Sequence, residues 1–473
     1  MNVDKPFVHF MALNKKIYLF DVNTNMISRI NERIYRHLML KEDVLALDPE
    51  DEILIENMKR AGMLKSNQIE KIEHPMTNFV EDIIENNMTR LTLQVTQNCN
   101  FRCEYCVYSG SYHNRVHNNK RMDWDTAKKA LDFLYEHSKN TSELTLSFYG
   151  GEPLLEIELI KQCVNYAKKI FKGKILTFNL TTNASLLADD IILYMQKEKF
   201  LLTISLDGPK EVHDKNRTFA DGKRGTYDVV MEHIVRIREI APDFVESVTF
   251  NAVLDDENDF RLINRYFMEN PVIRDMVVST NYINDVNRKD ELARNNEENY
   301  LDISRGKFRG MMYLLGRLPR ENVSKLVVRE ISDIIQIMHK RLVAKQTIQK
   351  VAHPGGPCMP GVHRPFVNAY GKIFPCERIN ETCGDMCIGD IYNGFDTEAI
   401  KKLLNVGKMT ESACKRCWAF NFCSQCGVAA DDGERMAPEV RLAKCERIRN
   451  SVDNMIKDYI VLKECGCDFT NDL

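Results

Sequence analysis

Between residues 90 and 280, apolar positions follow two alternating periodicities. Short runs rich in β-branched and aromatic residues predict strands, and the stretches between them carry apolar residues at helical spacing. The predicted strands are Leu91–Val95, Leu144–Phe148, Ile175–Leu180, Leu201–Leu206, Val248–Val253 and Met276–Thr280. The predicted helices include Thr126–Ser138, Glu156–Phe171, Ala188–Gln196 and Tyr227–Ile240. Because strands and helices alternate, we predict an α/β fold whose parallel sheet is open or curled into a partial barrel.

The first 80 residues have a different pattern. Val8–Phe10 and Ile17–Phe20 predict two short strands, with a turn at Asn14 and Lys15. Apolar residues at helical spacing between residues 30 and 38, and again between 53 and 60, predict two short helices. This order suits a winged-helix-like peptide-recognition domain. It suits as well an N-terminal extension that packs on the main body.

The last part of the chain loses its regular periodicity. Residues 282–350 are charged and helical in pattern, and we expect residues 311–350 to form a helical linker. From about residue 351, Gly, Pro and Cys become dense until a final helix is predicted near Pro438–Leu462. Irregular segments of this kind are usually held by something other than an apolar core. We therefore predict four regions, 1–80, 81–310, 311–350 and 351–473.

The composition is that of an ordinary globular protein. The 473 residues include 65 Lys and Arg against 68 Asp and Glu, with a formal net charge of −3. Because no basic excess is present, we expect no nucleic-acid partner. No apolar run approaches the roughly 18 residues of a membrane-spanning helix, and the N-terminus has no basic stretch leading into an apolar one. We therefore expect a cytoplasmic protein with no membrane partner.

The 15 cysteines are unevenly placed. Three lie between residues 99 and 106, Cys163 stands alone, and eleven lie between 358 and 467. In a large chain without an export signal, thiols stay reduced and clustered cysteines more often hold metal. Cys163 lies at helical spacing among Ile160 and Val164, so we expect it to be a small buried apolar residue.

Cys99, Cys103 and Cys106 follow the first predicted strand at C-x3-C-x2-C spacing. Cysteines so spaced can converge on one metal centre from a single loop. They are one thiolate short of the four that complete an iron–sulfur cube or a closed zinc site. An iron with an open position can bind a small molecule. The alternative is a zinc loop whose fourth ligand lies elsewhere.

This cysteine motif, with aromatic Tyr105 before its last cysteine, resembles that of radical SAM enzymes. The resemblance implies a partial (β/α)6 TIM-like barrel and a [4Fe–4S] cluster held by the three cysteines. In that family the open iron takes the amine and carboxylate of S-adenosylmethionine (SAM). An electron from the cluster then cleaves SAM to a 5′-deoxyadenosyl radical, which abstracts a hydrogen atom from substrate.

Three further motifs support the resemblance, each at the end of a predicted strand, where barrel folds usually place their sites. They are Tyr149-Gly150-Gly151-Glu152-Pro153, Thr181-Thr182-Asn183-Ala184 and Ile204-Ser205-Leu206-Asp207-Gly208. The resemblance implies that Glu152 meets the SAM amine, Ser205 the ribose and Arg217 the carboxylate. Tyr105 and Leu254 would contact adenine. The expected SAM contacts are Tyr105, Gly150, Gly151, Glu152, Asn183, Ser205, Arg217 and Leu254.

The C-terminal cysteines resemble the SPASM extension of peptide-modifying radical SAM enzymes, which carries auxiliary iron–sulfur clusters. Carried over by position, auxiliary cluster I would be held by Cys358, Cys376 and Cys426, and auxiliary cluster II by Cys414, Cys417, Cys423 and Cys445. Two residues separate Cys423 from Cys426, where the family has three. The resemblance therefore implies three [4Fe–4S] clusters in the chain. A pair of zinc knuckles is the alternative.

Auxiliary cluster I has only three ligands in this assignment. Relatives with a closed cluster have an extra cysteine six residues after the first, and this chain has Arg364 there. We expect an open iron that can bind a substrate thiolate, unless Cys383 or Cys387 completes the site. Cys465 and Cys467 receive no role.

These resemblances imply a maturase of sactipeptide or ranthipeptide type. It would form thioether crosslinks from cysteine sulfur to an α-, β- or γ-carbon in a ribosomally made, cysteine-rich precursor peptide. The leader of that peptide would bind the N-terminal domain as an added strand, and a flavodoxin- or ferredoxin-type protein would donate electrons. The alternatives are an anaerobic sulfatase-type (formylglycine) maturase, a carbon–carbon crosslinking enzyme and a non-catalytic iron–sulfur scaffold. The sequence assigns no general base and no other catalytic residue.

Overall fold

A computed structural model describes residues 5–40, 47–108, 111–112, 117–222, 224–283, 288–289, 296–344, 347–356 and 358–470. Its central feature is a sheet in which six parallel strands lie side by side in chain order. These strands are β5 (Arg90–Thr96), β7 (Glu143–Gly150), β8 (Ile175–Thr182), β9 (Phe200–Ser205), β11 (Val248–Leu254) and β12 (Val277–Tyr282). Each overlaps its predicted strand, with ends shifted by at most two residues, so the α/β fold with a parallel sheet is confirmed.

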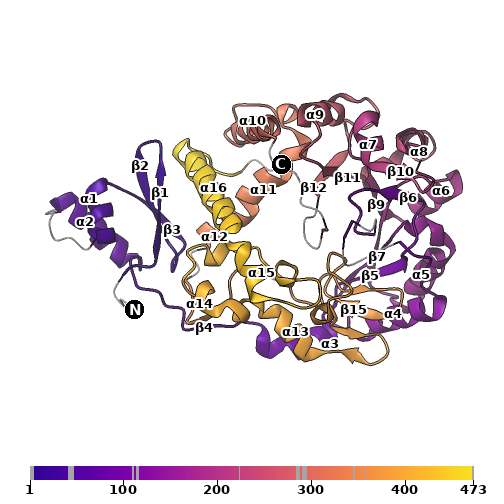
Figure 1. Ribbon diagram of the computed structural model, residues 1–473, viewed down its shortest axis with the longest axis horizontal. Helices are drawn as coiled ribbons and strands as arrows, with labels where there is room; N and C mark the ends of the chain where they lie inside the picture. The colour runs from indigo at the N-terminus through magenta and orange to yellow at the C-terminus, as the bar shows by residue number, and fades with distance from the viewer. Residues whose placement is uncertain are drawn as a thin grey trace.

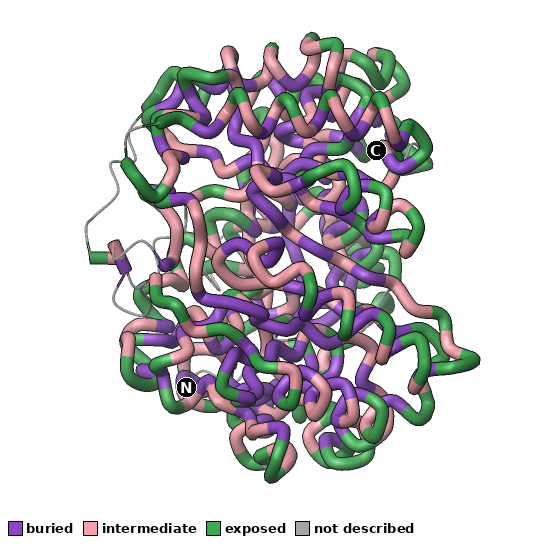
Figure 2. The backbone as a smooth tube through the Cα atoms, turned by 90° about the vertical axis from the view of Figure 1, so that its right-hand side faces the viewer, coloured by how far each residue is buried: buried purple, intermediate pink, exposed green. Residues whose placement is uncertain are grey.

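Helices cover the outer side of the strand arc (Figure 1). They are α4 (Trp124–Glu136), α5 (Ile157–Ile170), α6 (Asp189–Lys197), α7 (Lys210–Asn216), α8 (Tyr227–Ile240) and α9 (Phe260–Glu269). α4 begins where the Asp123 carboxylate accepts the Thr126 N–H at 2.8 Å, a side-chain cap for a helix N-terminus. The apolar stripes of the helices pack on the strands, and the buried residues form the interior in Figure 2.

The C-terminal region extends this sheet beyond β5. β14 (Phe366–Val367) pairs parallel with β5, and the sheet continues antiparallel through β15 (Lys372–Phe374), β16 (Gly389–Asp390) and β17 (Gly394–Phe395). The hydrogen-bonded order runs from β12 to β17 without returning, so the sheet is open. As a result, the cysteine-rich C-terminal region is attached to the strand that leads into the Cys99–Cys106 loop.

The N-terminal unit is a three-stranded antiparallel sheet with two helices. Its elements are β1 (Val8–Leu13), β2 (Lys16–Asp21), β3 (Met26–Ile30), α1 (Glu32–Leu40) and α2 (Pro49–Arg60). β3 was not predicted, because its sequence MISRI lacks a continuous apolar face. Asn14 and Lys15 both have positive φ, the backbone that a two-residue hairpin turn requires.

The N-terminal sheet has a packed partner on each face. Leu19 and Ile30 pack with the two helices, whereas Phe20 belongs to a core shared with the C-terminal region. β1 lies against α16 (Cys445–Glu464), where His9 Nε2 lies 3.0 Å from an Asp453 carboxylate oxygen. Figure 1 shows the unit beside α16, on the far side from the parallel strands. The N-terminal unit is therefore a small module that also packs against the C-terminal region of the chain.

The remaining elements connect these parts. In the first half of the chain they are β4 (Lys71–Ile72), α3 (Val80–Asn86), β6 (Phe101–Cys103) and β10 (Arg217–Phe219). In the second half they are α10 (Glu297–Leu314), α11 (Val328–Asp333), α12 (Lys340–Val343), β13 (Val351–Ala352), α13 (Thr397–Leu404), α14 (Glu411–Cys414) and α15 (Pro438–Ala443). A π-helical turn, Ile334–His339, joins α11 to α12. Among the described residues, no helix combines the length and the apolar character needed to cross a membrane.

Candidate active site and cysteine clusters

The cysteine loop between β5 and β6 lines a large cavity. Cys99, Cys103 and Cys106 all contribute to the wall of this cavity, whose volume is about 920 Å³. Each sulfur lies near an N–H group of the chain. The donors are the backbone N–H groups of Phe101 (3.3 Å from Cys99 Sγ) and Tyr108 (3.5 Å from Cys106 Sγ), Asn183 Nδ2 (3.8 Å from Cys99 Sγ) and Arg217 Nη1 (4.0 Å from Cys103 Sγ). Such donors suit thiolate ligands of an iron–sulfur cluster and tune its potential.

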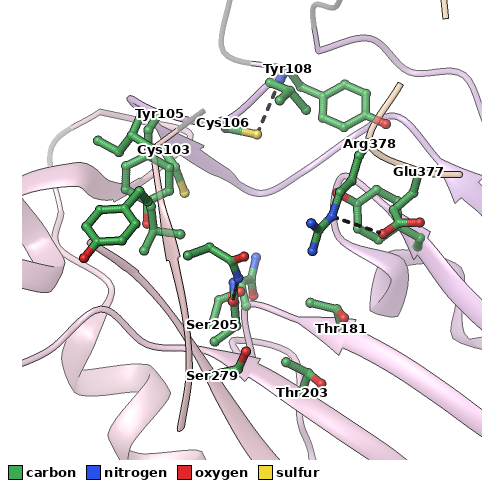
Figure 3. Close-up of a pocket in the computed structure, with 18 of the residues that line it drawn as sticks. Cys103, Tyr105, Cys106, Tyr108, Thr181, Thr203, Ser205, Ser279, Glu377 and Arg378 are labelled. Atoms are coloured by element: carbon green, nitrogen blue, oxygen red, sulfur yellow. Dashed lines mark hydrogen bonds and ion pairs between the residues drawn. The ribbon is translucent and has the colours of Figure 1, made fainter. Parts of the chain in front are cut away.

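The cavity lies at the carboxyl ends of the parallel strands. Residues from these ends present mostly neutral hydroxyl and amide groups, among them Thr181, Thr203, Ser205, Asn251 and Ser279. Figure 3 shows Cys103, Tyr105 and Cys106 on one side, Ser205, Thr203 and Ser279 along the strand ends, and Glu377 with Arg378 on another side. Glu377 and Arg378 come from the C-terminal region, so both the parallel sheet and the cysteine-rich region build this cavity.

Gly150 and Gly151 bring the end of β7 against the cysteine loop. Gly151 N–H donates to Thr96 O at 3.0 Å, and Glu152 N–H donates to Asn98 O at 2.9 Å. A Cβ on Gly150 would lie 2.0 Å from Thr96 O, and φ there is +141°. The two glycines therefore do more than let a ligand approach, because they allow the backbone at the end of β7 to pack directly against the backbone at the start of the cysteine loop.

Gly151→Ala is expected to displace the cysteine loop. The added Cβ would lie 2.0 Å from Asn98 O and 3.1 Å from Cys99 Cβ, so the backbone must move. We expect a loss of about 1–3 kcal/mol in the free energy of unfolding and a fall in bound iron. The measurement is thermal unfolding with iron analysis under anaerobic conditions. Gly384→Ala is the control, because its Cβ meets nothing within 4 Å; equal behaviour of the two variants would contradict the role of Gly151.

Glu152 lies behind the cavity wall and is fully buried. Oε1 accepts hydrogen bonds from Thr182 Oγ1 (2.7 Å) and Leu154 N (3.0 Å), and Oε2 accepts one from Asn183 N (2.8 Å). Burial raises the pKa of Glu152 to about 7, against the lowering effect of these donors. Its carboxylate thus joins the end of β8 to the glycine turn, and the cavity lining does not include it. The other seven expected SAM contacts do line the cavity.

Arg217 reaches the cavity as part of a buried ion pair with Asp207. Its Nε and Nη2 lie 2.8 and 3.0 Å from the two oxygens of Asp207. Burial alone would raise the pKa of Asp207, but the paired guanidinium holds it below its usual value. The Arg217 guanidinium also lies 5.3 Å from the centre of the Tyr105 ring. Asp207 directly follows the Ser205 strand end, and this position was the sequence signal that could have identified it.

A known family model matches the part of the chain that builds most of this site. Residues 93–265 match the model of the radical SAM superfamily. The chain contains a radical SAM domain. That family uses SAM with a [4Fe–4S] cluster. The cavity suits these groups, because three cysteine sulfurs with nearby N–H donors lie in its wall beside an arginine.

Two of the curated relatives illustrate the similarity to known enzymes. A cysteine-type anaerobic sulfatase-maturating enzyme of Clostridium novyi (strain NT) is 32% identical over 152 residues, which are 31% of this chain and 40% of the relative. The radical SAM cyclopropyl synthase TigE of Paramaledivibacter caminithermalis is 24% identical over 173 residues, 35% of each chain. The chain thus spans well under half of the length of these relatives.

The fold resembles solved structures over a longer stretch. Native anSMEcpe with bound AdoMet gives a TM-score of 0.58 at 19% identity, over 79% of this chain and 99% of that one. The same protein with AdoMet and the Kp18Cys peptide gives 0.56 at 18% identity, over 80% and 99%. At this level of identity the likeness shows a shared fold. It extends well beyond the radical SAM domain.

The four cysteines expected at auxiliary cluster II lie together beyond the radical SAM domain. The Cys423 thiol interacts electrostatically with the thiols of Cys414, Cys417 and Cys445. Arg441, which is 1% exposed, lies among them, with Nη2 4.0 Å from Cys414 Sγ. Gln425 Nε2 donates to Cys445 Sγ at 3.5 Å. A buried cation and an amide beside four sulfurs suit an anionic cluster.

The three cysteines expected at auxiliary cluster I also lie together. Cys358 and Cys376 each interact electrostatically with Cys426 and with Arg364. Arg364 forms an ion pair with Glu377, and Arg378 Nε lies 3.8 Å from the same carboxylate. Arg364, Glu377 and Arg378 all line the cavity of the radical SAM domain. This cysteine group therefore adjoins the cavity wall.

Cys383 and Cys387 have other surroundings. The Cys383 thiol, which is 1% exposed, forms a hydrogen bond with Asp431, and burial raises its pKa to about 12. Cys387 Sγ donates to Gly389 O at 3.4 Å. Both side chains pack in the main apolar core.

In the described part of the chain, no three His, Cys, Asp or Glu side chains converge closely enough for a single metal ion.

Cys383→Ala and Cys387→Ala are expected to retain the full iron content of the wild type. The reason is that each thiol already has an oxygen partner, Asp431 for Cys383 and Gly389 O for Cys387. Cys383→Ala is also expected to lower the free energy of unfolding by about 1–2 kcal/mol, because it leaves a buried cavity and removes a bond to Asp431. Iron and sulfide analysis after anaerobic reconstitution checks this. A loss of about four iron atoms in either variant would identify a cluster ligand.

Proposed function

We propose that this chain is a radical SAM peptide maturase that forms thioether crosslinks between a cysteine sulfur and a carbon of another residue. When bound, the cofactors would supply a 5′-deoxyadenosyl radical and an iron site for the thiolate, with the second electron passing to the auxiliary clusters. One hydrogen would leave the acceptor carbon as an atom, and the other would leave the thiol as a proton. The product would keep the sulfur of the substrate and lose two hydrogens.

The observation that carries this proposal is the group formed by Cys358, Cys376 and Cys426. Three thiols lie together, the position of a fourth is taken by Arg364, and the neighbouring side chains line the same cavity as the Cys99–Cys106 loop. A cluster held by three cysteines has one iron open to a further thiolate. Such an iron beside the SAM cavity would hold a substrate cysteine near the reacting carbon.

The substrate would be a ribosomally made precursor peptide. Polar strand ends and charged residues from the C-terminal region line a cavity large enough for a peptide segment beside a cofactor. The solved anSMEcpe structure with a Kp18Cys peptide supports a peptide partner. The N-terminal sheet would take the leader as an added strand, at the β3 edge, because β1 lies against α16. A flavodoxin- or ferredoxin-type protein would donate electrons.

The test is anaerobic incubation of the reconstituted chain with SAM, a reductant and a short cysteine-rich peptide, chosen from reading frames beside its gene. We expect release of 5′-deoxyadenosine and a peptide that has lost about 2 Da per crosslink, with its sulfur retained and the linked cysteines protected from alkylation. Conversion of the peptide without thiol protection would exclude thioether formation. Absence of 5′-deoxyadenosine with and without peptide would favour a non-catalytic scaffold.

A sulfatase-type maturase is the second candidate, and the relatives favour it. The C. novyi relative is named as such an enzyme, and anSMEcpe shares the fold over most of this chain. Formylglycine formation from cysteine expels the sulfur, whereas a thioether retains it. Mass analysis of the same incubation therefore separates the two candidates. A peptide product that has lost sulfur and reacts with an aldehyde reagent would support the sulfatase-type activity.

A further inference from the structure

Asp207 is a buried carboxylate that connects three parts of the cavity wall. Oδ2 accepts hydrogen bonds from Arg217 Nε at 2.8 Å and from the Tyr105 hydroxyl. Oδ1 accepts hydrogen bonds from Arg217 Nη2 and from Val253 N, both at 3.0 Å. Each oxygen therefore accepts two hydrogen bonds. The donors come from the cysteine loop, from β10 and from the end of β11. Asp207 is 1% exposed and stands behind Tyr105, Arg217 and Val253, which line the cavity.

This arrangement fixes the orientation of Arg217. Two guanidinium nitrogens are held by one carboxylate, a geometry that restricts rotation of the planar group. The third nitrogen, Nη1, lies 4.0 Å from Cys103 Sγ, beside the position of the cluster. The Tyr105 ring lies against the same guanidinium at 5.3 Å. A ligand with an anionic group, bound at an open iron beside Cys103, would therefore meet the Nη1 edge of Arg217.

We propose that Asp207 is a positioning residue for SAM, which acts by aiming Arg217 at the carboxylate of SAM. The proposal rests on the SAM-binding part of the proposed function and is independent of the peptide chemistry. Asp207 itself does not touch the ligand. Its effect on binding should therefore depend on the presence of a carboxylate in the ligand.

Asp207→Asn separates this role from a general structural one. The asparagine amide would place an NH2 group where one carboxylate oxygen accepts two donors. In one orientation it would face Arg217 Nε and the Tyr105 hydroxyl, and in the other Arg217 Nη2 and Val253 N. Either way Arg217 loses one of its two bonds and the negative charge that holds it. The guanidinium would then turn away from the ligand carboxylate.

The experiment compares equilibrium binding of SAM and of decarboxylated SAM to the reconstituted full chain, without peptide and under anaerobic conditions. For wild type we expect tighter binding of SAM. For Asp207→Asn we expect the Kd for SAM to rise on the order of 10- to 100-fold, the effect of losing one charged hydrogen bond, with the Kd for decarboxylated SAM changed less than about threefold. The electron paramagnetic resonance change that SAM causes in the reduced cluster should weaken in parallel. Iron content verifies that the variant holds its clusters.

Asp214→Asn is the matched control. Asp214 is a nearby carboxylate in α7 that accepts hydrogen bonds from Thr226 N (2.7 Å) and Tyr227 N (2.8 Å), and within the described part of the chain it forms no hydrogen bond or ion pair with the Arg217 guanidinium. An asparagine oxygen can accept both of these bonds, so binding of both ligands should match wild type. Equal weakening of SAM and decarboxylated SAM by Asp207→Asn would overturn the proposal, and so would no change for either ligand.

Asp207→Glu decides the case in which Asp207→Asn fails to hold its clusters. The glutamate keeps the charge but moves the carboxylate by one methylene, so we expect a smaller loss that still affects SAM and spares decarboxylated SAM. A loss that affects both ligands equally would assign Asp207 a structural role only. If the peptide test failed while SAM bound as expected, thioether formation alone would be excluded.

Discussion

Arg364→Cys is expected to abolish crosslink formation while SAM cleavage continues. The substitution places a thiol where Arg364 now interacts electrostatically with Cys358 and Cys376. The resemblance to the SPASM extension implies that relatives with a closed cluster have a cysteine at this position. A fourth thiolate would fill the open iron that we propose for auxiliary cluster I, because a protein thiolate competes with a substrate thiolate at effective concentrations that the peptide cannot match. We expect the rate of crosslinking to fall by about 100-fold or more.

The measurement is the yield of crosslinked peptide and of 5′-deoxyadenosine from the same anaerobic reaction. Release of 5′-deoxyadenosine should stay within about threefold of wild type, because Arg364, although it lines the same cavity, pairs with Glu377 of the C-terminal region and not with the Cys99–Cys106 loop. Arg364→Ser is the matched control, since it removes the same guanidinium and its ion pair to Glu377 but provides no thiolate. We expect Arg364→Ser to retain crosslinking. If Arg364→Cys crosslinked as well as Arg364→Ser, the open-iron proposal would be wrong.

Cys103→Ala is expected to remove SAM cleavage altogether. Cys103 is buried, lies in the cavity wall and has Arg217 Nη1 4.0 Å from its sulfur. Without it, only two thiols of the loop remain, and two ligands do not retain a cube that normally needs three or four. Release of 5′-deoxyadenosine should fall by about 1,000-fold or more. If the chain holds three clusters, bound iron should fall from about twelve to about eight atoms.

Cys163→Ala provides the comparison for Cys103→Ala. Cys163 is also fully buried, but it lies in α5 and packs among apolar residues of the core. Its loss should cost about 1–2 kcal/mol of unfolding free energy and leave iron content and SAM cleavage unchanged. Iron analysis, SAM cleavage and thermal unfolding distinguish the two cysteines. Retention of all iron in Cys103→Ala would contradict its assignment as a ligand.

The parallel sheet was predictable because local pattern and global fold agree in this part of the chain. Leu91, Leu93 and Val95 of β5 are wholly buried and alternate with polar residues, which is the period-two pattern that predicts a strand. The strand ends could then be placed to within two residues, and with them the Ser205 and Thr181 edge of the cavity. β3 was not predicted because it lies at a sheet edge and carries two consecutive polar residues, Ser28 and Arg29, which interrupt the apolar pattern.

The role of Glu152 could not be derived from its motif. The sequence places a carboxylate after two glycines, and that arrangement suits a ligand ammonium as well as a buried backbone contact. In the structure Oε1 accepts hydrogen bonds from Thr182 and Leu154, and Oε2 accepts one from Asn183. The Leu154 contact is local, whereas Thr182 and Asn183 come from the end of β8, which no pattern around Glu152 could identify. A contact of Glu152 with the SAM amine stays a prediction.

The sequence by itself determined the chemistry available to this protein. The spacing of Cys99, Cys103 and Cys106 and the order of strands and helices depend on residues close in the chain, where periodicity and ligand spacing act directly. Only the tertiary structure decided which distant groups meet. It brought Asp207 behind Arg217, directed Cys383 to Asp431, and set Arg364 beside Cys358 and Cys376 at the cavity wall. These contacts join side chains from different elements, so no periodicity within one element predicts them, and the cost of closing the loops between those elements is met by core packing rather than by any local preference.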